Sequence, residues 1–142
     1  MIAVACDEDG VVALDVAEGQ RNDAPLAKAV LIEARDAVGT VRDVLGDKGF
    51  DSDAVRDVIL DDLDALPVIP NRKNRKEPWP WDDEMREIYK QRNRVERAFA
   101  KAKQFRRFAT RHEKLKDFYL GVARLVFGFI HVRKLAESVN TA

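Results

Sequence analysis

The chain has 142 residues, of which 46% are hydrophobic, and this is enough apolar material to build one folded domain, which argues against a disordered chain. Its single cysteine, Cys6, excludes an internal disulfide and a multi-cysteine zinc site, as suits a reducing cytoplasm. The apolar residues 120–132 contain Arg124 and His131 and are too short to cross a bilayer. With no signal-peptide pattern at its start, the sequence predicts a soluble cytoplasmic protein without membrane contact.

The net charge of zero hides an uneven distribution of charged side chains. Residues 1–66 hold 16 acidic and 6 basic side chains, whereas residues 67–142 hold 9 acidic and 19 basic, so the halves carry −10 and +10. A basic half can neutralise DNA phosphates, and an acidic half can supply carboxylates for metal ions. Composition alone leaves an alternative open, in which the two halves are solvated surfaces that attract each other.

The first elements in chain order are a hairpin and a helix. Two apolar, β-rich runs, residues 2–6 and 11–16, are separated by an acidic turn that ends in Gly10, a pattern typical of an antiparallel hairpin within residues 2–16. Asp23 can cap a helix with apolar residues at helical spacing, and Gly39 ends it.

Short strands and a second helix follow. Residues 41–45 form a strand candidate, and the glycine-flanked Asp47 then lies at the carboxyl end of that strand. Asp51 or Ser52 can cap the second helix. The Pro-Val-Ile-Pro run at residues 67–70 indicates a further edge strand.

The C-terminal half is predicted to consist of a basic loop and two long helices. Residues 71–81 combine basic residues, prolines, Trp79 and Trp81 without a hydrophobic period, so we expect a loop. Helical patterns follow over residues 82–105 and 113–136. Strands that alternate with helices predict an α/β fold, with short strands followed by the two long C-terminal helices.

Four polar residues recur along the first of these helices. On a continuous α-helix Tyr89, Arg92, Glu96 and Lys103 fall within an arc of about 60°, beside an apolar stripe that can bury against a sheet. A carboxylate held between cations at the border of a core is a candidate functional group. Arg92 and Glu96 are equally an ordinary i, i+4 pair that stabilises an exposed helix.

The spacing Tyr89-x2-Arg92-x3-Glu96-x6-Lys103 resembles the tyrosine–arginine–glutamate–lysine signature of DDE transposases from bacterial insertion sequences. The sequence around Asp47 resembles the motif of that family's second aspartate. The segments that resemble the family are residues 18–23, 47–52, 67–76 and 104–111. The resemblance as a whole extends from about residue 10 to residue 130.

The resemblance implies an RNase H-like fold in which two aspartates and a glutamate hold two Mg²⁺ ions beside a scissile phosphate, so that the intact enzyme cuts and joins DNA strands. Asp47, within the second-aspartate region of residues 41–66, would be the second ligand and Glu96 the third. DNA would be contacted by Tyr89, Arg92, Lys103 and the basic cluster Arg72, Lys73, Arg75 and Lys76. Trp79 and Trp81 would either stack on an unpaired base or pin the loop to the core.

The sequence departs from the family pattern at its start. The first aspartate of the family lies on a strand that precedes the hairpin, and Asp7, Asp9 and Asp15 are poor substitutes because the first two occupy the hairpin turn. We therefore expect residues 1–142 to be a single, N-terminally truncated catalytic domain, with an incomplete site that binds Mg²⁺ weakly and is inactive alone. An uncovered sheet edge would favour aggregation.

Three origins remain open for such a chain: the second half of a frameshifted transposase, a decayed remnant, or a truncated gene model. Its partners would be DNA, in a nucleoid-associated setting, and either an upstream-frame half or a second copy. The competing hypothesis is a catalytically inactive DNA-binding or regulatory remnant. A third hypothesis is a helical interaction protein that matches the motifs by chance.

Overall fold

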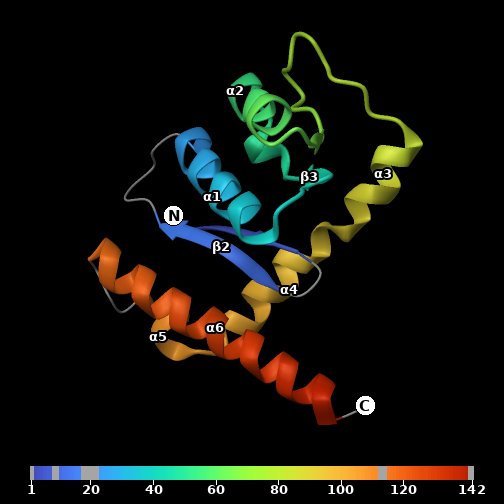
Figure 1. The fold of residues 1–142 in the computed structure, drawn as a ribbon. Helices are drawn as coiled ribbons and strands as arrows, with labels where there is room; N and C mark the ends of the chain where they lie inside the picture. Colours follow the sequence, from blue (N-terminus) through green and yellow to red (C-terminus); the bar gives the residue numbers. More distant parts are fainter. Residues whose placement is uncertain (1, 8–9, 17–22, 112–114, 141–142) are drawn as a thin grey trace.

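The structure is a computed structural model that describes residues 2–7, 10–16, 23–111 and 115–140 (Figure 1). It has a mixed α/β fold with short strands and a long C-terminal helix. The elements in chain order are β1 (Ile2–Cys6), β2 (Val11–Val16), α1 (Asp23–Val38), β3 (Asp43–Leu45), the 3-10 turn η1 (Lys48–Phe50), α2 (Asp53–Asp57), the π-helical turn η2 (Val58–Asp62), β4 (Leu66–Val68), α3 (Asp83–Tyr89), the 3-10 turn η3 (Lys90–Arg92), α4 (Asn93–Ala102), α5 (Arg106–Ala109) and α6 (Lys116–Asn140).

The strands form two separate two-stranded sheets. β1 and β2 are antiparallel and pair Ile2 with Val16, which confirms the predicted hairpin, and the Asp7 carboxylate closes its turn by accepting from the Gly10 N–H at 2.9 Å. β3 and β4 are parallel, with Asp43 opposite Leu66. Both strands predicted from residues 41–45 and 67–70 are therefore present, with slightly different bounds.

Helices cover both faces of the hairpin (Figure 1). Ala13 packs against Val30 of α1 on one face. Leu14 and Val16 belong to a cluster with α6 on the other face. That cluster also contains the buried residues Ala102, Phe108, Tyr119, Ala123, Val126 and Phe127. Successive side chains of β2 point to opposite faces of the hairpin, and this alternation determines whether a side chain packs against α1 or α6.

The second core packs against α2, and α2 begins as the sequence predicts. The Ser52 hydroxyl accepts from the Val55 N–H at 3.3 Å, as an N-cap residue does. Ile59 is fully buried and packs with Ala27 of α1 and Ile69 after β4. The helix continues beyond residue 57 as the π-helical turn η2.

The first long C-terminal helix differs from the prediction for residues 82–105. Asp82 caps it, accepting from the Met85 N–H at 2.8 Å, but the helix tightens into η3 before α4 resumes at Asn93. The tightened turn spans Lys90–Arg92 and ends directly before Asn93, the first residue of α4. The residues therefore form two shorter helices, α3 and α4.

The second long helix is confirmed with shifted ends. α6 spans Lys116–Asn140, whereas residues 113–136 were predicted, and residues 113 and 114 lie outside the described part of the chain. The familial segment at residues 18–22 also lies outside it. α1 begins at Asp23 and ends at Val38, directly before Gly39 with φ of +82°, as the sequence predicts.

Candidate functional site

Asp47 lies in a tight loop directly after β3. Its carboxylate accepts from the Gly49 N–H at 2.7 Å and caps η1, and the side chain is otherwise exposed. A Cβ on Gly49 would stand 2.7 Å from Asp47 Oδ1, so the loop requires glycine at this position if the carboxylate is to keep its place. The sequence thus sets a carboxylate with open lone pairs at the end of a strand.

Arg72 holds the same loop from the far side. Its side chain donates to the Lys48 carbonyl at 2.8 Å and to the Gly49 carbonyl, 23 residues away in the chain. This arginine was predicted to contact DNA, and that contact stays a prediction; the side chain is exposed, and its Nε and Nη2 bond to the backbone beside Asp47. The observed bonds make Arg72 a positioning residue for the Asp47 loop.

A buried ion-pair network holds the backbone of Arg72. The Asp51 side chain is 0% exposed and the Arg56 side chain 1%, and two guanidinium nitrogens of Arg56 donate to Asp51 Oδ1 at 3.0 and 3.1 Å. Asp51 also accepts from Arg75 Nη1 at 2.8 Å and from the Arg72 N–H at 2.6 Å. One carboxylate therefore joins α2 to the basic loop.

The charge state of Asp51 follows from these contacts. Burial is the largest influence and would raise its pKa, but the hydrogen bonds from the Arg72 N–H and from Arg56, with the charges of Arg56 and Arg75, outweigh it and hold the pKa below its ordinary value. Asp51 is thus ionised in the folded protein at neutral pH. The sequence marks Asp51 as a helix-cap candidate within the familial segment 47–52 and does not single out Arg56, because the pairing depends on how η1 packs against α2.

The basic loop is folded onto α2 through Trp79. Arg56 lies over the Trp79 ring at 5.0 Å, and the Asn71 side chain donates to the Trp79 carbonyl at 2.8 Å and accepts from its N–H at 2.9 Å. Trp79 therefore follows the second of the two predicted alternatives and pins the loop. Lys73 and Lys76 are exposed, whereas Arg75 is also paired with Asp53.

Glu96 projects from α4 beside two of the residues predicted with it, Tyr89 and Arg92. Its carboxylate accepts from Arg92 Nη2 at 2.5 Å, and the Arg92 guanidinium lies 5.5 Å from the centre of the Tyr89 ring. Trp81 meets the same Tyr89 ring edge-on, with centroids 5.4 Å apart. Trp81, Tyr89, Arg92 and Glu96 thus form a continuous line of contacts despite the break at η3.

Tyr89 is influenced by the charges of both predicted metal-binding carboxylates. Burial raises the pKa of its phenol, the Arg92 charge lowers it, and the charges of Asp47 and Glu96 raise it. Both carboxylates, 49 positions apart in the sequence, therefore lie within electrostatic reach of one phenol. Lys103 stands apart at the C-terminal end of α4, where it is exposed.

The chain matches a known protein family over most of its length. The family model described as "Transposase DDE domain" matches residues 1–127. The chain belongs to the DDE transposase family. A protein of Brucella ovis described as the transposase for insertion sequence element IS6501 is 30% identical over 115 residues, which cover 81% of this chain and 83% of that protein. No solved structure matches the chain significantly.

Membership of the DDE transposase family links the chain to DNA transposition and to divalent metals. The described residues contain no group of three or more His, Cys, Asp or Glu side chains arranged to hold a metal ion. Asp47 and Glu96 nevertheless fit Mg²⁺ in kind, because that ion is held by one or two carboxylates, with water and substrate phosphate completing the shell. None of the described helices is long and apolar enough to cross a membrane.

Other aspartates of this transposase-family chain are engaged elsewhere. Asp7 closes the hairpin turn, and Asp15 bonds to the Val16 N–H at 2.7 Å and lies 3.6 Å from Lys116. Asp9 lies outside the described residues. Among the described residues, Asp47 and Glu96 are the exposed carboxylates whose charges raise the pKa of Tyr89.

Proposed function

We propose that Asp47 and Glu96 are two of the metal-binding carboxylates of an RNase H-like centre that cuts and joins DNA strands. The supporting observations are that Asp47 stands exposed in the loop after β3, that Glu96 of α4 pairs with Arg92 beside the Tyr89 ring, and that both carboxylate charges raise the pKa of Tyr89. When bound, Mg²⁺ supplies activation of the attacking oxygen and stabilisation of the leaving oxygen. The chain's own residues hold the two carboxylates in position and supply hydrogen-bond donors for a phosphate.

Arg92 and Tyr89 are the residues placed to meet that phosphate. Arg92 uses Nη2 for Glu96, and a guanidinium has five N–H donors, so others remain for a phosphate oxygen. Because the pKa of Tyr89 is raised, its phenol keeps its proton at neutral pH and can donate a hydrogen bond. Lys73, Lys76 and Lys103 supply exposed charge for the DNA backbone, while Arg72 and Arg75 act mainly by holding the loop.

A further strand between the two sheets would complete the centre. A pocket of about 600 Å³ is lined by Ala5 and Cys6 of β1 on one side and by Val44 and Leu45 of β3 on the other. β1 pairs with β2 and β3 pairs with β4, so each presents its second edge for pairing. We infer that a strand from a further transposase segment, such as an upstream-frame half, enters here and brings the remaining carboxylate.

Metal binding by the chain itself tests the proposal, with Mn²⁺ as the probe because its ligand preferences resemble those of Mg²⁺. Mn²⁺ affinity, measured by the relaxation rate of water protons, should fall several-fold in Asp47→Asn and in Glu96→Gln. Glu87→Gln is the matched control, since Glu87 is an exposed glutamate of α3 paired with Lys90 at 2.5 Å. Equal affinity in all four proteins would overturn the assignment of the two ligands.

DNA binding separates this function from the alternative of a non-catalytic DNA-binding remnant. Glu96→Gln should leave the salt-dependent affinity for a duplex unchanged or raise it slightly, whereas Arg92→Ala and Lys103→Ala should weaken it and reduce its salt dependence. DNA binding without carboxylate-dependent Mn²⁺ binding would favour the remnant. Absence of both would favour an interaction protein.

A further inference from the structure

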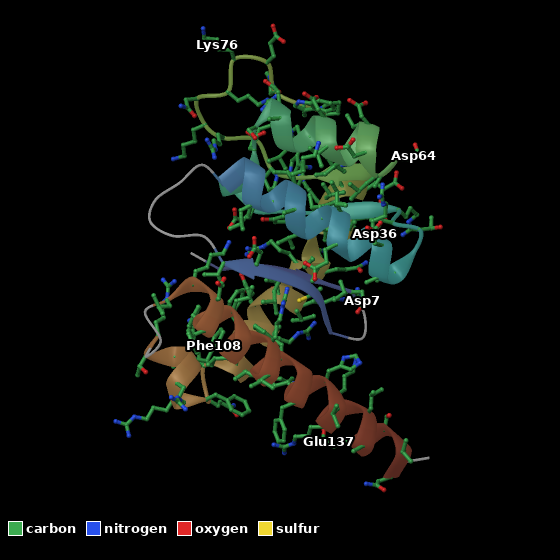
Figure 2. All side chains as sticks on the ribbon, turned by 60° about the vertical axis from the view of Figure 1, so that its left-hand side comes forward. Asp7, Asp36, Asp64, Lys76, Phe108 and Glu137 are labelled. Carbon is green, nitrogen blue, oxygen red and sulfur yellow. The ribbon has the colours of Figure 1, made fainter. Side chains whose placement is uncertain are left out.

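The C-terminal half of α6 extends beyond the rest of the fold (Figures 1 and 2). An exposed apolar stripe runs along the whole of α6. Every residue from position 132 to position 140 is exposed. The large hydrophobic side chains of the stripe retain half or more of their accessible surface: Phe118 66%, Leu125 76%, Phe129 56%, Val132 64%, Leu135 50% and Val139 75%.

The exposed area is large for a monomer. An aromatic side chain buries about 150 to 250 Å² when covered, so these fractions leave on the order of 600 Å² of apolar surface in water. That value reaches the upper limit for the largest patch of an ordinary monomer, and it approaches the roughly 800 Å² that each partner contributes to a standard interface. The stripe is therefore large enough to support a specific complex.

The spacing of the stripe identifies its partner as another helix. Phe118, Leu125, Val132 and Val139 recur at intervals of seven residues, which defines the a positions of a heptad. The d positions are then Gly121, Gly128 and Leu135, and the e positions are Val122, Phe129 and Ala136. The a, d and e positions are all apolar, the pattern of a helix that buries one face against a second helix.

Gly121 and Gly128 determine whether a parallel or an antiparallel pair of helices fits. Each costs about 1 kcal/mol relative to alanine inside a helix. Neither has any atom within 4 Å of the place where a Cβ would stand, apart from its own helix backbone and chain neighbours. In a parallel pair d faces d, so the glycines of two copies would face each other and leave voids. In an antiparallel pair a faces d, so large and small side chains interdigitate.

We propose that α6 pairs antiparallel with α6 of a second copy of this chain. In the fitting register Val132 lies opposite Gly128 of the partner subunit, Val139 opposite Gly121 of the partner subunit, and Leu125 opposite Leu135 of the partner subunit. The projecting end of each helix then covers the exposed first half of the other. This dimer does not depend on the proposed metal centre, so the two can fail separately.

Sedimentation equilibrium of the full chain over a micromolar concentration series tests the association. The wild-type chain should form dimers, and Leu125→Lys should raise the dimer dissociation constant at least tenfold. Because Leu125 is 76% exposed, the substitution should leave the fold intact, which circular dichroism checks. The matched control Lys134→Glu changes an exposed charge on the opposite face of the helix and should leave the dissociation constant within about twofold.

Engineered disulfides test the direction of pairing in a Cys6→Ser background. Residues 125 and 135 of one helix are about 15 Å apart, too far for a bond within one chain. Leu125→Cys combined with Leu135→Cys should therefore give a covalent dimer on mild oxidation, and Val132→Cys alone should not. A monomer at every concentration, or a dimer unaffected by Leu125→Lys, would overturn the interface. Cross-linking through Val132→Cys alone, without the double variant, would overturn the antiparallel arrangement.

Discussion

Replacing Asp51 by asparagine is expected to destabilise the protein by about 3 kcal/mol, because it leaves a buried guanidinium without its counter-charge. Asp51 and Arg56 are both almost fully buried, and Asp51 accepts four hydrogen bonds from three arginine residues. Asparagine keeps the shape but turns an N–H toward one of these donors. Arg56 retains its bond of 2.7 Å to the Ile69 carbonyl, which keeps the loss at the lower end of the range for broken buried pairs.

Urea unfolding at neutral pH measures this loss. With a slope of roughly 1.5 to 2 kcal/mol per molar, the midpoint should fall by about 1.5 to 2 M without a change in slope. Asp53→Asn is the control, because Asp53 also pairs with Arg75 but its side chain is 75% exposed, and an exposed pair contributes at most about 1 kcal/mol. Equal effects of the two substitutions would refute the view that burial makes the Asp51 network important.

The pH dependence gives an independent measurement of the same network. The folded pKa of Asp51 is lowered, so the carboxylate contributes stability that is present above its unfolded pKa of about 4 and is lost as the pH falls through the folded value. The stability difference between wild type and Asp51→Asn should therefore shrink as the pH falls below about 4. A difference that stays constant to pH 2 would contradict ionisation of Asp51 as its source.

Two further predictions concern the candidate site. Gly49→Ala should lower Mn²⁺ affinity with little loss of stability, because the new Cβ would stand 2.7 Å from Asp47 Oδ1 and turn the carboxylate away; unchanged affinity would show that this orientation is not needed. Arg92→Ala should raise the pKa of Tyr89 further, because the Arg92 charge lowers it and the Asp47 and Glu96 charges raise it. An ultraviolet titration measures this pKa, and a downward shift would refute the electrostatic account of the site.

Local patterns predicted the elements of this fold well, because each depends on near neighbours in the chain. The hairpin follows from two apolar runs around a turn, and the cap at Ser52 follows from a side chain that reaches a backbone N–H three residues on. The break at η3 was missed, because hydrophobic periodicity continues across it and a 3-10 turn of three residues hardly changes the pattern.

The candidate site was predictable where the family signature covers it and unpredictable where long-range contacts decide it. Arg92 and Glu96 pair as their spacing suggests. Arg72 belonged to a cluster that composition alone indicates for DNA, yet it bonds to carbonyls 23 and 24 residues away. A basic run does not reveal which of its members also bond within the protein, since that depends on where Asp51 and the Asp47 loop lie in the fold.

The Asp51 network links stability to the geometry of the proposed metal ligands. Asp51 fixes the Arg72 backbone through a bond of 2.6 Å, and the Arg72 side chain fixes the carbonyls beside Asp47. A weakened network would therefore release the Asp47 loop before the domain unfolds, because the loop is held at its surface by one guanidinium. Part of the positive charge in the basic half thus holds a carboxylate in place, in addition to the DNA contacts proposed for that half.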